Sequence, residues 1–167
     1  MKNIKVSELD QDINFEKIKI KIHQIVVNPD NRVFVILIDE NERQAGLELN
    51  SYEASMLSFV HQGFHKYSHI NTIHQLYVKF LENMKTKIEE IDVESKVDDI
   101  IYCTLRFVDK NYNRAYAVVS IADALILSRI NDCPLYVIKN TWEDFDMIDD
   151  WDYEDFIVDF EKDDNDE

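Results

Sequence analysis

The carboxylate of Asp123 is the first candidate for chemistry in this chain. It lies three residues after Ser120, in the stretch Ser-Ile-Ala-Asp-Ala-Leu-Ile-Leu-Ser. A serine followed by an acid at this spacing is typical of a capped helix start, and the apolar residues that follow predict a short helix buried on most faces. Asp123 is therefore either a helix cap or a catalytic group at the mouth of that helix.

Two further ionisable side chains, Glu53 and His74, lie at expected helix starts. Glu53 follows Asn50 by three residues, which is again a capping pattern, and His74 lies in the first turn of the next helix. Each has a structural explanation to weigh against a catalytic one. Helix N-termini also bind phosphate through their free backbone N–H groups. If the N-termini of the three expected helices lie close together, they could bind a phosphate group.

Three histidines, His61, His65 and His69, follow one another at intervals of four residues. On one continuous helix they would form a metal-binding face. Gly63 lies between the first two and is typical of a helix end, which argues against continuity. The sequence contains neither a phosphate-binding glycine loop nor a serine flanked by the glycines of a nucleophile elbow, so neither kind of site is expected.

The periodicity of the apolar residues predicts the elements that position these groups. Seven strands are expected. The first covers residues 17–23 and continues through 25–27, and the others lie at residues 32–38, 44–49, 88–93, 100–107, 114–119 and 135–138. Helices are expected at residues 50–62, 73–84 and 120–131. This order predicts an α+β domain with a mixed, largely antiparallel sheet of about six or seven strands and three helices.

The second of these helices has the clearest pattern in the chain. Its apolar residues recur at helical spacing on one face. They are Ile73, Leu76, Tyr77, Phe80, Leu81 and Met84.

Composition and charge divide the 167 residues into a domain and a tail. We expect residues 1–140 to form the domain, with residues 1–15 as an extended arm, and residues 141–167 to form an acidic-aromatic tail. The chain has a net charge of -16, and residues 143–167 alone carry fourteen acids and one base. Tail aromatics such as Trp142 and Trp151 predict either packing on the domain or another subunit, or docking on a partner.

The chain shows no pattern of membrane insertion or export. It has no apolar run long enough to span a membrane and no apparent signal peptide. Its two cysteines, Cys103 and Cys133, lie in apolar runs, which favours buried thiols in a reducing compartment. We therefore expect a cytoplasmic protein with no membrane partner.

Four short motifs occur in order along the domain. They are Leu-Asn-Ser-Tyr-Glu-Ala at 49–54, a glycine at 63, Ile-His-Gln-Leu at 73–76, and the stretch at 120–128 followed by Pro-Leu-Tyr-Val at 134–137. In this order and spacing they resemble the bifunctional nuclease domain family, which is widespread in bacteria and plants, over residues 22–139. The resemblance implies DNase and RNase activity and a nucleic-acid substrate.

The resemblance also implies which residues act. Glu53, His74 and Asp123 match polar positions of the family motifs and are the expected catalytic residues, with Glu53 and Asp123 as ligands of Mg²⁺ or Mn²⁺ that would activate water. Other positions depart from the family. Ser120-Ile121 replaces an Arg-Pro pair, which removes a bidentate phosphate ligand, and Gln75 replaces an aspartate.

Two hypotheses follow from these observations. The first is a metal-assisted nuclease of the bifunctional type, whose activity the departures reduce or abolish. The second is a non-catalytic, homo-oligomeric binding or scaffold domain, whose acidic-aromatic tail docks a protein partner or the domain's own groove.

Overall fold

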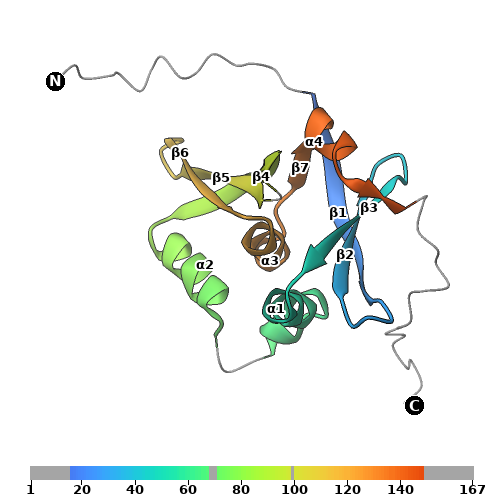
Figure 1. Cartoon of the computed structure of the whole chain (residues 1–167). Helices are drawn as coiled ribbons and strands as arrows, with labels where there is room; N and C mark the ends of the chain where they lie inside the picture. Colours follow the sequence, from blue (N-terminus) through green and yellow to red (C-terminus); the bar gives the residue numbers. More distant parts are fainter. Residues whose placement is uncertain (1–15, 68–70, 99, 149–167) are drawn as a thin grey trace.

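Turn and cap residues divide the chain into the elements that form the domain. The computed structural model describes residues 16–67, 71–98 and 100–148 (Figure 1). The strands are β1 (Lys17–Val27), β2 (Val33–Asp39), β3 (Gln44–Leu49), β4 (Thr86–Val97), β5 (Ile100–Asp109), β6 (Arg114–Ser120), β7 (Leu135–Ile138) and β8 (Asp146–Met147). The helices are α1 (Ser51–His61), the 3-10 turn η2 (Phe64–Lys66), α2 (Ile73–Asn83), α3 (Ile121–Asn131) and α4 (Lys139–Glu143).

The strands form one mixed sheet in the order β6-β5-β4-β7-β1-β2-β3-β8. All neighbouring strands are antiparallel except β4 and β7, which are parallel. The predicted fold class, α+β with a largely antiparallel mixed sheet and three main helices, is confirmed. The short strand β8 and the five-residue helix α4 are the additions.

Helix α3 lies at the centre of the molecule. Figure 1 shows it end-on, with the strands curving around it and with α1 and α2 on either side, and it packs against both of these helices. Its residues are buried on most faces, as its apolar composition predicts, and they join the main core. The core thus holds α3 between the sheet and two other helices, and so fixes the position of the Asp123 helix start.

Strand β2 is buried on both sides of the sheet. Val35 and Leu37 belong to the main core under the helices, whereas Ile36 belongs to a second cluster with Val26 and Ile148 on the other side. Side chains alternate across a strand, so the continuous apolar run of β2 supplies both clusters.

Helix α2 buries a different side from the one its pattern suggests. An amphipathic helix normally turns its apolar stripe to the core, yet here the buried side chains are Gln75, Val78 and Leu81. Leu81 is the single member of the predicted apolar face among them. The other five members are exposed and are called the outer α2 face: Ile73, Leu76, Tyr77, Phe80 and Met84.

The packed structure continues past residue 140. Trp142 and Phe145 are buried in the main core, and β8 pairs with β3 at the edge of the sheet. The predicted domain boundary therefore falls inside a packed segment, and the aromatics of residues 141–148 pack on the domain. The predicted arm (1–15) and the rest of the tail (149–167) lie outside the described residues.

Among the helices of the described residues, none combines the length and the apolar character that crossing a membrane requires.

Candidate functional site

Two of the three predicted site residues meet at the N-termini of α2 and α3. The Nε2 atom of His74 lies 2.8 Å from Oδ1 of Asp123, although the two residues are 49 positions apart in the sequence. His74 lies in the first turn of α2 because Thr72 caps that helix, and Thr72 and Gln75 form a complete capping box. The packing of α2 on α3 brings the two helix starts together.

Asp123 is at the same time part of the α3 cap. Its backbone N–H donates to the Ser120 hydroxyl at 3.2 Å, and that hydroxyl donates to Oδ2 of Asp123 at 2.9 Å. Each carboxylate oxygen therefore has its own partner, His74 on one side and Ser120 on the other. The sequence left a cap and a catalytic group as alternatives, and this geometry allows both, because the cap holds the carboxylate in a fixed orientation.

The two members of the pair differ in their access to solvent. The side chain of His74 is 11% exposed, whereas that of Asp123 is 50% exposed. The other ring nitrogen of His74, Nδ1, is buried and has no hydrogen-bond partner among the described residues. A neutral ring that donates from Nε2 to the carboxylate leaves Nδ1 as a bare acceptor, which avoids burying an unpaired N–H. Asp123 is thus the member that can touch a substrate, and His74 orients it.

Glu53 is held in a separate arrangement. Its carboxylate accepts from the Asn50 backbone N–H, while its own N–H donates to the Asn50 side chain, both at 3.0 Å, so the predicted capping box is complete. Within residues 16–67, 71–98 and 100–148, no three His, Cys, Asp or Glu side chains are grouped so as to hold a metal ion. The structure therefore brings together His74 and Asp123 of the predicted set, and Glu53 does not complete a ligand cluster with them.

The histidine series is interrupted as predicted. Helix α1 ends at His61, and Gly63 follows in the left-handed region with φ of 79°. Burial lowers the pKa of His61, and the nearby charge of Arg129 adds to this effect. Burial also lowers the pKa of His65, with a smaller contribution from Lys66. His69 lies outside the described residues.

An open cavity of 480 Å³ lies at the other end of α3. It is lined by Lys19 and Lys21 of β1, Arg129 of α3, and the Asp132–Tyr136 segment that leads into β7. Neither lysine forms an ion pair within the described part of the chain. This site was not predicted from the sequence, in which the alternating lysines of β1 are a signal that points to it.

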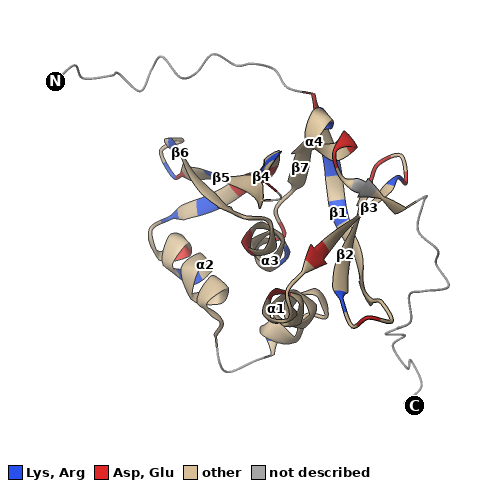
Figure 2. Ribbon diagram, viewed as in Figure 1, with Lys and Arg blue, Asp and Glu red and all other residues tan. Residues whose placement is uncertain are grey.

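The neighbouring cation of β1, Lys17, is engaged in the structure. It forms ion pairs with Glu90 and with the buried carboxylate of Asp92, to which Arg106 of β5 is also paired. Lys17 also lies over the ring of Tyr136 at 5.7 Å. Figure 2 shows the lysines along β1, together with the acidic and basic segments of β4 and β5. Lys17 therefore forms ion pairs within the sheet, whereas Lys19, Lys21 and Arg129 line the cavity.

Comparison with known protein families gives a match that covers most of the domain. The family model described as the bifunctional nuclease domain matches residues 35–148. This range includes α1, α2 and α3, the His74–Asp123 pair and the packed segment up to β8. No curated protein matches the chain.

Proposed function

The chain belongs to the bifunctional nuclease domain family, and we propose on this premise that it hydrolyses phosphodiester bonds of DNA or RNA at the His74–Asp123 pair. The observation that carries the proposal is the 2.8 Å contact between these two side chains at adjoining helix N-termini. Both residues come from motifs that the resemblance identified. In this proposal Asp123 is the catalytic residue and His74 the positioning residue.

The arrangement suits the activation of a water molecule. A half-exposed carboxylate can accept the proton of a water that attacks phosphorus, and it works best when its orientation is fixed beforehand. His74 and Ser120 supply that orientation, since each bonds one oxygen of Asp123. The N-terminus of α3 adds a positive dipole end close to the position where phosphate charge would lie.

The site could hold Mg²⁺ or Mn²⁺ through one protein carboxylate, if water and substrate supply the remaining ligands. Mg²⁺ often takes one or two protein carboxylates and completes its shell with water and substrate phosphate oxygens. Asp123 offers one exposed carboxylate for such an ion, whereas Glu53 is bonded within its own capping box. A bound divalent ion would lower the pKa of its water and neutralise charge on the phosphate. The role of Glu53 as a second ligand stays a proposal.

Binding of the nucleic-acid backbone requires cations, and among the described residues no Lys or Arg forms an ion pair with Asp123. We assign this task to the cavity with Lys19, Lys21 and Arg129. The eleven residues of α3 make it about 16 Å long, so the cavity and Asp123 lie at opposite ends of one helix. Phosphate contacts there would supply affinity without sequence preference.

The full chain should be tested on fluorescent single-stranded DNA, double-stranded DNA and RNA, with Mg²⁺, with Mn²⁺ and with a chelator. We expect cleavage that Asp123→Asn abolishes. Glu82→Gln, which changes an exposed carboxylate of α2, is the matched control and should leave the rate unchanged. Cleavage that persists in Asp123→Asn would refute the assignment. A loss of metal-dependent rate in Glu53→Gln would bring Glu53 into the site.

The positioning role of His74 needs its own readout. Glutamine can keep an N–H donor close to the place of Nε2, whereas leucine cannot. We expect His74→Gln to retain more kcat than His74→Leu, with KM similar in both. Equal loss in both variants would contradict orientation through the hydrogen bond.

Two observations favour the second candidate function, a non-catalytic oligomeric scaffold. The outer α2 face presents five large apolar side chains to solvent, and Ser120-Ile121 replaces the family's Arg-Pro pair. In this alternative the acidic-aromatic tail captures a protein partner. The two free cysteines, of which Cys103 is buried, support the cytoplasmic location proposed for either function.

A further inference from the structure

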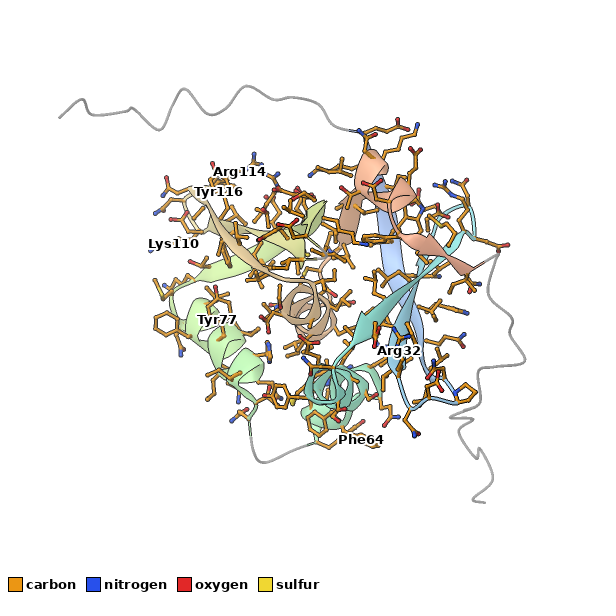
Figure 3. All side chains as sticks on the ribbon, viewed as in Figure 1. Arg32, Phe64, Tyr77, Lys110, Arg114 and Tyr116 are labelled. Atoms are coloured by element: carbon orange, nitrogen blue, oxygen red, sulfur yellow. The ribbon has the colours of Figure 1, made fainter. Side chains whose placement is uncertain are left out.

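The outer α2 face is an exposed apolar face that follows one side of a helix. Ile73, Leu76, Tyr77, Phe80 and Met84 are between 36 and 68% exposed. All five lie on one helix of eleven residues or at its C-cap. Figure 3 shows Tyr77 on α2 at the periphery of the molecule. Scattered apolar residues are normal on a protein surface, but a contiguous apolar face indicates an interaction site.

Helix α2 has two apolar sides, one of which is buried and the other exposed. At 3.6 residues per turn, the five exposed residues are centred roughly 140° around the helix from the buried Gln75, Val78 and Leu81. The buried side packs on α3 and β4. The outer side remains exposed among the described residues, although it carries most of the apolar residues of the helix.

The charges of α2 suit contact with another α2. Beside the apolar residues, the helix carries one exposed cation, Lys79, and one exposed anion, Glu82. Its formal charge is therefore zero, whereas the whole chain has a net charge of -16. Two copies of α2 can therefore pack against each other without repulsion between like net charges.

The area of the face matches what a symmetric dimer needs. With about 200 Å² for each large side chain, the exposed fractions of the five residues give roughly 500 Å² of apolar surface. A stable interface takes about 800 Å² from each partner, of which about 65% is apolar in homodimers, or roughly 500 Å². The polar remainder can come from the flanks of α2.

We propose that the outer α2 face is the interface of a symmetric homodimer, in which α2 of one chain packs against α2 of a second copy. A two-fold axis that passes near Phe80 places the same residues of both chains opposite each other. His74 lies on another side of the same helix, where it contacts Asp123. The dimer therefore leaves that contact in place, and the proposal does not depend on nuclease activity.

The mass of the full chain in solution tests this proposal. Analytical ultracentrifugation at micromolar concentration should give twice the 19.8 kDa mass of the chain. Phe80→Glu places a charge at the centre of the interface and should give a monomer. The matched control is Ile100→Glu, since Ile100 has similar exposure (54% against 59% for Phe80) and begins β5 at the other end of the β4–β5 hairpin from α2.

Each outcome has a definite meaning. A dimer that Phe80→Glu dissociates and Ile100→Glu preserves, with circular dichroism unchanged in both, supports the proposal. A monomeric wild-type chain overturns it, because the outer α2 face is then covered by the chain's own tail or by a different partner. A dimer that survives Phe80→Glu, or that Ile100→Glu dissociates equally, also overturns it.

Discussion

Replacement of Trp142 tests whether the segment after residue 140 belongs to the core. Trp142 is fully buried, and its ring packs edge-to-face on Phe145 with centroids 5.7 Å apart. Removal of a buried tryptophan side chain typically costs about 3–5 kcal/mol, which includes the loss of the aromatic pair. We therefore expect Trp142→Ala to lower the free energy of unfolding by about 4 kcal/mol.

The same side chain carries an offsetting cost. The indole N–H of Trp142 is buried and has no hydrogen-bond partner among the described residues. An unpaired buried donor costs about 1–3 kcal/mol. Trp142→Phe removes this donor while it keeps an aromatic ring, so the lost area and the relieved donor nearly cancel. We expect that variant to lie within about 1.5 kcal/mol of the wild type.

Urea and thermal unfolding followed by circular dichroism measure both variants. For a chain of this size, 1 kcal/mol corresponds to about 2–4 °C in Tm, so Trp142→Ala should lower Tm by roughly 10 °C. A loss below about 1 kcal/mol in Trp142→Ala would refute the placement of this residue in the core. A Trp142→Phe variant as unstable as Trp142→Ala would refute the argument from the unpaired N–H, because only the alanine variant removes the ring.

Three further predictions concern titration, thiol reactivity and nucleic-acid binding. The pKa values of His61 and His65 are lowered in the folded chain, so the unfolded chain binds protons first and the free energy of unfolding should fall as pH drops below about 6.5. Urea unfolding of a His61→Gln, His65→Gln double variant should show a smaller fall. An equal fall would contradict the claim that these two histidines cause it. Burial raises the pKa of Cys103 to about 12 and that of Cys133 to about 11. Both thiols should therefore react slowly with a disulfide reagent in the native state and rapidly in urea. A fast reaction in the native state would argue against their burial. Lys19→Gln with Lys21→Gln should weaken binding of single-stranded DNA. The slope of log K against log[salt] should fall in magnitude by about 1.4, because each lysine that neutralises a phosphate of a single strand releases about 0.7 counterions. Fluorescence anisotropy measures this slope, and an unchanged slope would exclude the cavity from the binding surface.

Local sequence signals located most elements correctly. Asn50 and Ser120 cap α1 and α3, as their spacing predicts. Gly63 ended α1 because it adopts a positive φ. These features depend on residues a few positions apart, which the sequence contains directly.

Features that depend on tertiary packing were harder to predict. The periodicity of α2 indicated an apolar stripe, but it could not show that Gln75 and Val78 would face the core instead. The acidic composition around Trp142 suggested a tail, although three apolar side chains in that segment are buried. The His74–Asp123 contact joins residues 49 positions apart, so only the packing of α2 on α3 could reveal it.

The most direct test of the central claim is cleavage of a fluorescent single-stranded oligonucleotide by the wild-type chain and by Asp123→Asn, with Glu82→Gln as control. The amide keeps the size of the Asp123 side chain but removes its charge and its capacity to take a proton. The wild type and Glu82→Gln should cleave at equal rates, and Asp123→Asn should not cleave. Equal cleavage by all three proteins would contradict the assignment of Asp123 as the catalytic residue, and a wild-type chain inactive on DNA and RNA with either metal ion would contradict the nuclease function itself.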